Sequence, residues 1–226
     1  MAHRTEAVIV AHGQPGDPCP QQAAIEALAA QVGARLPEWR VYGATLAAEG
    51  ALEAVAHPGA LIYPFFMAEG WFTGRELPRR LAKAGAEGAQ VLRPFGLDPA
   101  LVALMQARAE AGAPATPGDC TLVLAAHGSQ RSQTSADSAR AMAAQMRGFR
   151  AVVTGFVEQA PYLADAAQVD GPALCLPFFA LTADHVTQDI PEALAQAGFS
   201  GPLLPPIGAA PEVPALIAAA LEAAHG

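Results

Sequence analysis

An internal repeat is the feature that most constrains how this chain can fold. The tripeptide Ala-His-Gly ends an apolar segment at His12 and again at His127. Two further segments recur in the same order, and the three are separated from their copies by 115, 113 and 113 residues. The matched pairs are 6–13 with 121–128, 61–66 with 174–179, and 75–81 with 188–194. Because order and spacing persist through a whole half, the 226 residues read as a duplicated unit of about 110 residues.

Each half alternates short apolar segments with longer segments of helical periodicity, a pattern that predicts parallel sheets covered on both faces by helices. The small, turn-rich segment 111–118 indicates a boundary. We therefore expect two α/β domains, 1–113 and 119–226, facing each other across a cleft. The predicted strands are 7–11, 41–46, 60–65, 90–92, 121–126, 150–157, 173–177 and one near 202–204. The predicted helices are 20–36, 74–84, 98–110, 134–147, 187–196 and 211–224.

Composition and charge exclude several classes of protein. The net charge of −8, with a single lysine (Lys83) and no basic tract, argues against a nucleic-acid partner. No apolar run approaches the roughly 20 residues of a membrane span. Three distant cysteines without a CxxC pair, and a start without an apolar leader, predict a cytoplasmic protein. Residues 1–113 hold 9 basic and 11 acidic groups and residues 114–226 hold 4 and 10, so we expect the acidic second half to attract a metal cation.

The residues that could carry chemistry follow predicted strands. Ligands of parallel α/β sheets bind beyond the carboxyl ends of the strands, and His12 and His127 both lie at such an end. The second half also has His185, where the first half has Phe72. Glu158 ends the strand between them and is matched by Ala47, or by Glu49 if the register slips by two residues.

Two imidazoles and a carboxylate form an open, borderline-soft set of ligands. The sequence therefore predicts a metal site at His127, Glu158 and His185. The alternative is that Glu158 is a solvated loop carboxylate and His185 a surface histidine.

The paired Ala-His-Gly strand ends, the Pro-Phe-Phe segments at 64–66 and 177–179, and the downstream histidine resemble class II tetrapyrrole chelatases. The likeness is to the CbiX-type sirohydrochlorin chelatases of cobalamin and sirohaem synthesis, and it covers about Glu6 to Leu221. This resemblance implies two Rossmann-like halves related by pseudo-two-fold symmetry, with a tetrapyrrole between them. It implies ATP-independent insertion of a divalent metal, with Co²⁺ as the first choice and Fe²⁺ or Ni²⁺ as alternatives, and no organic cofactor.

The resemblance carries metal handling and catalysis onto His127 and His185, with Glu158 as a third metal ligand. His12, Arg131, Phe179 and Arg75 are predicted to contact the sirohydrochlorin-like substrate, the arginines through its carboxylates. Many long CbiX-type chains keep the complete histidine pair in the first half. Phe72 breaks that pair here, an arrangement more like the anaerobic cobaltochelatases and the protohaem ferrochelatases.

Other functions fit the residues less well. Histidine phosphatases place an arginine before the histidine of such a strand end, where this chain has Ala11 and Ala126. A nucleotide-binding module lacks support because neither half has GxGxxG after its first strand. A tetrapyrrole or metal carrier that kept the fold without turnover stays open, and the apolar helix predicted over 211–224 could cover its own sheet or pair two chains in a homodimer.

Overall fold

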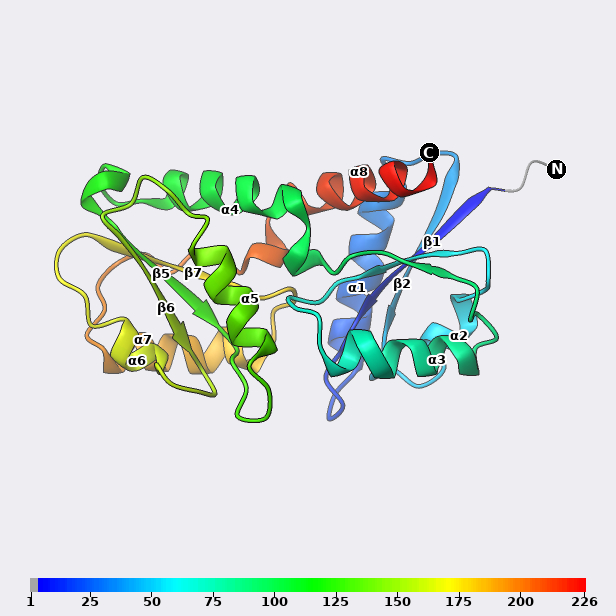
Figure 1. Ribbon diagram of the computed structural model, residues 1–226, viewed down its shortest axis with the longest axis horizontal. Coiled ribbons are helices and arrows are strands. Elements are labelled where there is room, and N and C mark those ends of the chain that lie inside the picture. The colour runs from blue at the N-terminus through cyan, green and yellow to red at the C-terminus, as the bar shows by residue number, and fades with distance from the viewer. Residues whose placement is uncertain (1–3) are drawn as a thin grey trace. The chain divides into compact units, whose positions relative to one another are not determined.

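The computed structural model describes residues 4–226 and contains two parallel β-sheets (Figure 1). The first has the strand order β2-β1-β3-β4 and the second β6-β5-β7. All strand pairs are parallel, which confirms the predicted α/β class with duplicated parallel sheets. The strands are β1 (Thr5–Ala11), β2 (Trp39–Thr45), β3 (Leu61–Pro64), β4 (Gln90–Val91), β5 (Thr121–Ala126), β6 (Ala151–Phe156) and β7 (Ala173–Pro177).

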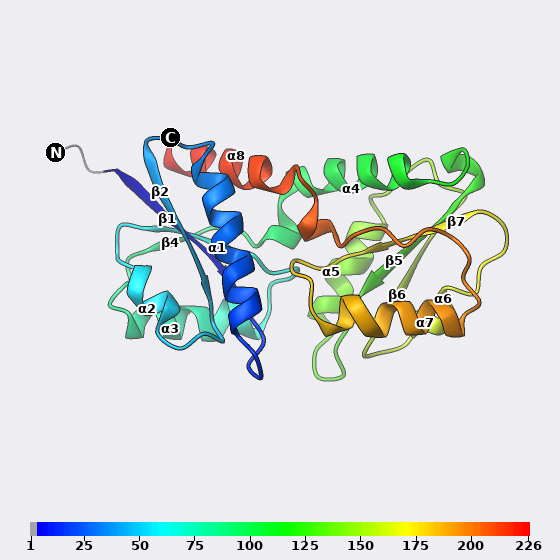
Figure 2. The same ribbon diagram turned by 180° about the vertical axis from the view of Figure 1, so that it is seen from behind.

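Helices cover both faces of the first sheet. On one face α1 (Cys19–Gly33) packs against β1 and β2, and α8 (Val213–His225) packs against α1 and β3 (Figure 2). On the other face α2 (Ala51–Val55) and α3 (Leu77–Lys83) cover a buried apolar cluster. Because both faces are covered, β1 is apolar and buried at successive positions instead of alternating. The members of the cluster include Val8, Val10, Leu46, Leu52, Ile62, Leu77 and Leu81.

The second sheet is covered in the same way. Helices α4 (Pro99–Gly112) and α5 (Thr134–Ala143) contact its strands, and α6 (Leu163–Ala166) contacts β6 and α7 (Ile190–Gln196). A second apolar cluster lies beneath α6 and α7, and it includes Val123, Ala125, Leu163, Cys175, Ile190 and Leu194. Every residue of β5 is buried, as the continuous apolar run in the sequence predicts.

The compact units of the structure divide the chain differently from the sequence repeat. One unit comprises 1–98 together with 211–226, and the other comprises 99–210. Helix α4, the last helix of the first repeat, therefore belongs to the second unit, and α8, the last helix of the second repeat, belongs to the first. The units thus have other boundaries than the predicted domains 1–113 and 119–226. The end of α8 is held within the first unit, where the His225 ring lies 5.1 Å from the Trp39 ring and its Nε2 lies 3.3 Å from the Thr5 hydroxyl.

Several elements differ from the sequence prediction. The strand expected near 202–204 is wrong: Leu203 makes only an isolated bridge with Cys175. Pro202, Pro205 and Pro206 flank it, and a ladder cannot extend through residues that lack a backbone N–H. The short helices α2 and α6 were not predicted. The predicted helices 74–84 and 187–196 each begin with a π-helical turn, η1 (Phe72–Glu76) and η4 (His185–Asp189). Three 3₁₀ turns complete the chain, at η2 (Phe95–Leu97), η3 (Pro117–Asp119) and η5 (Ile207–Ala209).

Glycine is required directly after both Ala-His strand ends. Gly13 and Gly128 have φ angles of +77° and +72°, in the left-handed region that disfavours other residues. A Cβ atom on Gly128 would lie 2.7 Å from Cγ of Gln159 and 2.9 Å from Cβ of Phe156. The left-handed turn redirects the chain at once and leaves the preceding histidine at the edge of the sheet.

We predict that Gly128→Ala destabilises the protein more than Gly148→Ala. Gly148 also has a positive φ of +76°, but no atom lies within 4 Å of the position of its added Cβ. Gly148→Ala should cost about 1–2 kcal/mol from backbone strain alone, and Gly128→Ala about 1–3 kcal/mol more from overpacking. Thermal unfolding of the two variants measures the difference, and equal losses of stability would contradict the close packing described for Gly128.

Candidate metal site

Three neighbouring strands of the second sheet place His127, Glu158 and His185 at one edge. His127 directly follows β5, Glu158 follows β6, and His185 begins the π-turn η4 after β7. Because β5 lies between β6 and β7 in a parallel sheet, the three carboxyl ends meet. The backbone N–H of Glu158 donates to the carbonyl of His127 at 2.9 Å, which extends the β5–β6 ladder to the site itself.

The structure brings the three predicted metal ligands together. One donor atom from each residue lies within 4.8 Å of the others, and within residues 4–226 this is the one such group of three or more potential ligands. The Glu158 carboxylate lies near both imidazoles, with one oxygen 3.7 Å from His127 Nδ1 and the other 4.0 Å from His185 Nε2. Donors around a tetrahedral metal are about 3.4 Å apart, so binding requires the side chains to approach by about an ångström. All three are only half-buried, which leaves room for that movement.

Hydrogen bonds at the Nδ1 atoms orient both imidazoles. His127 Nδ1 lies 2.8 Å from the carbonyl of Gly128, and His185 Nδ1 lies 2.5 Å from a carboxylate oxygen of Asp189. A carbonyl or a carboxylate ion can only accept, so these contacts place a proton on each Nδ1, and in a neutral imidazole the lone pair is then on Nε2. This tautomer leaves Nε2 available to a metal. The hydrogen bond from Nδ1 to its partner makes Nε2 a stronger electron-pair donor.

A pocket of about 550 Å³ adjoins the site and is acidic. Glu158 and His185 are among its lining residues, and further carboxylates come from Asp165, Asp189 and Glu192. No lysine or arginine belongs to the lining of this pocket. These carboxylates give the pocket a negative charge beside His185, and negative charge of this kind attracts cations.

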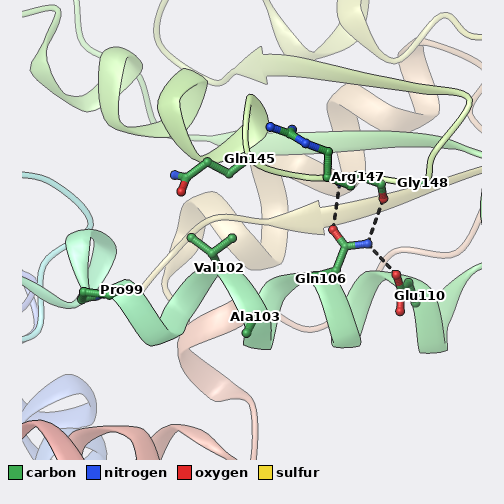
Figure 3. Close-up of a pocket in the computed structure, with 8 residues that line it drawn as sticks. All are labelled: Pro99, Val102, Ala103, Gln106, Glu110, Gln145, Arg147 and Gly148. Carbon is green, nitrogen blue, oxygen red and sulfur yellow. Dashed lines mark hydrogen bonds between the residues drawn. The ribbon is translucent and has the colours of Figure 1, made fainter.

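A larger hollow of about 700 Å³ lies in the same unit between α4 and the turn at 144–148 (Figure 3). The side chain of Gln106 holds this turn, since it accepts from the backbone N–H of Arg147 at 3.0 Å and donates to the Arg147 carbonyl at 2.8 Å. The lining contains no histidine or cysteine and one carboxylate, Glu110, which already accepts from Gln106 at 2.6 Å. The larger hollow therefore offers no group of side chains suited to binding a metal.

The first unit has the same turn with different side chains. The backbone N–H of Ala47 donates to the carbonyl of His12 at 2.9 Å, as that of Glu158 donates to His127, so Ala47 and not Glu49 is the counterpart of Glu158. The His12 ring meets the Phe72 ring edge-on at 4.0 Å and 71°, and the His127 ring meets the His185 ring at 4.5 Å and 85°. Phe72 thus occupies the place of the second histidine, and the first unit lacks two of the three ligands.

The four predicted substrate contacts have different environments. Arg75 and Arg131 are exposed, and His12 is half-buried at its strand end. Phe179 is only 8% exposed and packs in the second apolar cluster, with its ring 6.3 Å from that of His127. This burial favours support of His127 over direct contact with a substrate.

Neighbouring arginines of Arg75 are engaged within the first unit. Arg79 donates two hydrogen bonds to Glu76, and Arg80 donates two to Glu53. Through these bonds the guanidinium groups lower the pKa of each carboxyl group. Arg75 makes no such ion pair within residues 4–226.

Asp189 was not among the residues selected from the sequence. It follows His185 by four positions, a spacing that places two side chains on the same side of a helical segment. This spacing is the sequence signal from which Asp189 could have been predicted as a partner of His185. The carboxylate–imidazole–metal arrangement is common where histidine binds a metal.

Comparison with known proteins assigns the family. The CbiX family model matches residues 6–111 and again 121–224, so both halves of the repeat are copies of one family unit. The chain belongs to the CbiX family. It is 53% identical to a solved CbiX described as the terminal enzyme for biosynthesis of sirohaem in denitrifying bacteria, covering 98% of this chain and 99% of that chain with a TM-score of 0.92.

More distant structures share the fold. SirB from Bacillus subtilis, solved with Fe³⁺, is 15% identical over 97% of this chain and 95% of its own, with a TM-score of 0.75. SirB from B. subtilis subspecies spizizenii, a sirohydrochlorin chelatase solved with cobalt, is 14% identical over 97% and 94%, with a TM-score of 0.67. The search of curated proteins gave no match. Within residues 4–226 no helix has the length and apolar character needed to span a bilayer.

We predict that Asp189→Asn weakens metal binding without unfolding the protein. The amide can no longer accept from His185 Nδ1 as a charged group, so the ring loses orientation and donor strength, and affinity for Co²⁺ should fall by about 10–100-fold. Titration followed by the visible absorption of bound Co²⁺ measures this. The control is Asp184→Asn on the preceding residue, which does not line the acidic pocket. Equal affinities of Asp189→Asn and wild type would show that Asp189 has no such role.

The differences between the units predict that two substitutions would create a second metal site, in the first unit. Ala47→Glu combined with Phe72→His restores the missing carboxylate and imidazole beside His12, at positions whose backbone matches that of the second unit. The double variant should bind two Co²⁺ ions per chain where the wild type binds one, as measured by equilibrium dialysis. A stoichiometry of one for the double variant would contradict the equivalence of the two strand ends.

Proposed function

We propose that the protein is a metal chelatase that inserts a divalent metal into sirohydrochlorin without ATP. The observation that carries this proposal is the convergence of His127, Glu158 and His185 at adjacent strand ends in a chain of the CbiX family. The 53% identical CbiX, matched over almost the full length of both chains, is described as an enzyme of sirohaem biosynthesis. A chelatase needs a site that holds a metal weakly and from one side, and three half-buried protein ligands provide that.

In this mechanism the second unit holds the metal before transfer. Nε2 of His127, Nε2 of His185 and a carboxylate oxygen of Glu158 replace part of its water shell and leave other coordination positions open. The acidic pocket beside Glu158 raises the local concentration of the cation. The ring nitrogens of the tetrapyrrole then take the open positions and displace the protein ligands one after another.

Insertion must also remove two protons from the pyrrole nitrogens. As the metal leaves, Nε2 of His127 becomes free to accept one of them, and a neutral imidazole is suited to this near neutral pH. The resulting imidazolium keeps its Nδ1–H bond to the Gly128 carbonyl and has the Glu158 carboxylate 3.7 Å away. We assign the second proton to Glu158, from which it passes to solvent. The charge balances because one M²⁺ replaces two H⁺.

The metal is the finer part of the proposal. Ligands of this type accept Co²⁺, Fe²⁺ or Ni²⁺, and selection among them depends on geometry and supply. The resemblance to CbiX-type chelatases implies Co²⁺ as the first choice. The role described for the 53% identical relative favours Fe²⁺, since sirohaem is an iron chelate. We therefore propose Fe²⁺ as the metal inserted, with Co²⁺ as the alternative that the same assay compares. A place in sirohaem synthesis follows from Fe²⁺ and one in cobalamin synthesis from Co²⁺.

Further roles are proposed for Arg131, Arg75 and His12. Arg131 and Arg75 are exposed guanidinium groups suited to the carboxylates of sirohydrochlorin. His12 is predicted to contact the substrate. A cytoplasmic location is also proposed.

We predict that His127→Ala and His185→Ala each reduce the rate of metal insertion by at least about 100-fold. Each removes one of three ligands, and His127→Ala also removes the proton acceptor. His12→Ala should have a much smaller effect because Ala47 and Phe72 complete no metal site around it. Anaerobic spectrophotometry of sirohydrochlorin with Fe²⁺ or Co²⁺ measures the rates. Loss of activity in His12→Ala with nearly normal activity in His185→Ala would contradict the assignment of the chemistry to the second unit.

A carrier without turnover is the second candidate, and it has the same ligands. Excess sirohydrochlorin and metal over protein distinguish the two functions. An enzyme converts many equivalents at a rate above the uncatalysed one. A carrier gives one equivalent of bound product, and that result would overturn the proposed activity while leaving the metal site intact.

A further inference from the structure

The carboxyl edge of the first sheet carries an aromatic surface, formed by Phe66, Trp71 and Phe72. The Trp71 ring meets the Phe72 ring edge-on at 5.0 Å, and Phe66 stacks on Phe72 with ring centroids 6.4 Å apart and planes 18° apart. His12 contacts the same Phe72 ring at 4.0 Å. The rings therefore support one another as a preformed surface.

Two of these side chains are exposed although they are large and apolar. Trp71 is 62% exposed and Phe72 is 36% exposed. Only three other large hydrophobic side chains within residues 4–226 are as exposed, Val91, Tyr162 and Leu203, and they are far apart in the sequence. Single exposed apolar residues are ordinary on protein surfaces, whereas adjacent aromatic rings in contact indicate a binding surface.

The aromatic surface of the first unit occupies the position in the fold that the predicted metal ligands occupy in the second unit. Phe72 begins η1 as His185 begins η4, and each ring meets the histidine of its own strand end at a nearly perpendicular angle. The duplicated fold has thus kept a side chain directed at this edge in both units. In the first unit that side chain has no metal-binding nitrogen, and it follows an aromatic residue, Trp71, where the second unit has Asp184.

A cation lies on the same turn. Arg75 lies in the same π-turn η1 as Phe72, and it follows Trp71, the residue directly before that turn, by four residues. Arg75 is exposed, in contrast to Arg80, which is held by Glu53. Exposed aromatic rings and an exposed guanidinium on one turn match a flat ligand that carries carboxylates at its rim.

We propose that Trp71, Phe72 and Arg75 bind the substrate ring, with the aromatic side chains against the macrocycle and Arg75 on a peripheral carboxylate. This inference rests on the proposed function, because sirohydrochlorin is the planar polycarboxylate that the chelatase would use. It assigns ring binding to the first unit and metal binding to the second. It also gives a reason for Phe72: a histidine there would add a competing metal site, whereas phenylalanine adds contact area.

The test is direct titration of the metal-free protein with sirohydrochlorin. Trp71→Ala should raise the Kd by about tenfold, the usual loss when a stacking aromatic side chain is removed. Trp71→Phe should restore most of the affinity, and Arg75→Gln should raise the Kd by about threefold and weaken its dependence on salt. Affinity for Co²⁺ without tetrapyrrole should be unchanged in all three variants, since none alters the metal ligands.

Val91→Ala is the matched control, because Val91 is an exposed apolar residue of the same unit, at 42% exposure, outside the aromatic surface. It should leave the Kd for sirohydrochlorin at the wild-type value. Equal Kd values for Trp71→Ala and Val91→Ala would overturn the inference. So would a change from dimer to monomer in Trp71→Ala with an unchanged Kd, because the surface would then bind a second copy of the chain. If the wild type itself binds no sirohydrochlorin, the proposed function fails too, whereas tight wild-type binding unaffected by Trp71→Ala overturns this inference alone.

Discussion

The candidate site depends on the parallel pairing of β5 with β6 on one side and β7 on the other. Parallel pairing brings three carboxyl ends to one edge, and the bond from the Glu158 N–H to the His127 carbonyl fixes their register at the site. A left-handed glycine after His127 then turns the backbone away and provides the carbonyl that orients the imidazole. The strand pairing and the glycine turn together fix the position and the hydrogen bond of the His127 imidazole. The three side chains lie near one another without an ion.

The two units show how one backbone can support two tasks. Their strand ends share the histidine, the left-handed glycine, the backbone bond and the π-turn. They differ in a few side chains. Ala47 stands opposite Glu158 and Phe72 opposite His185, and in the proposed mechanism these two differences decide which unit binds the metal. Charge follows the same division, because the acidic pocket is lined by Glu158 and His185, and the exposed Arg75 follows Trp71 by four residues in the first unit. In the proposed mechanism the second unit handles the cation and the first the anionic ring.

The repeat made much of this predictable from the sequence. Matching the halves placed His127, Glu158 and His185 at strand ends of one sheet, and it identified Ala47 and Phe72 as their counterparts. Asp189 could have been found from its spacing to His185, but a carboxylate four residues from a histidine is common on helices, and only the 2.5 Å contact distinguishes it. Contacts between distant segments were not accessible. The repeat gives the order of α4 and α8 but not the sheet that each one covers, and three prolines end the pairing near Leu203 that its apolar character suggested.

The most direct test of the central claim is where a metal binds in the intact protein. Crystals soaked in Co²⁺ and measured at the cobalt absorption edge give the position of the ion independently of activity. The account predicts one strong anomalous peak within about 2.0–2.2 Å of Nε2 of His127, Nε2 of His185 and an oxygen of Glu158, and none beside His12. A peak at His12, or an ion held without His185, would contradict the assignment of metal binding to the second unit.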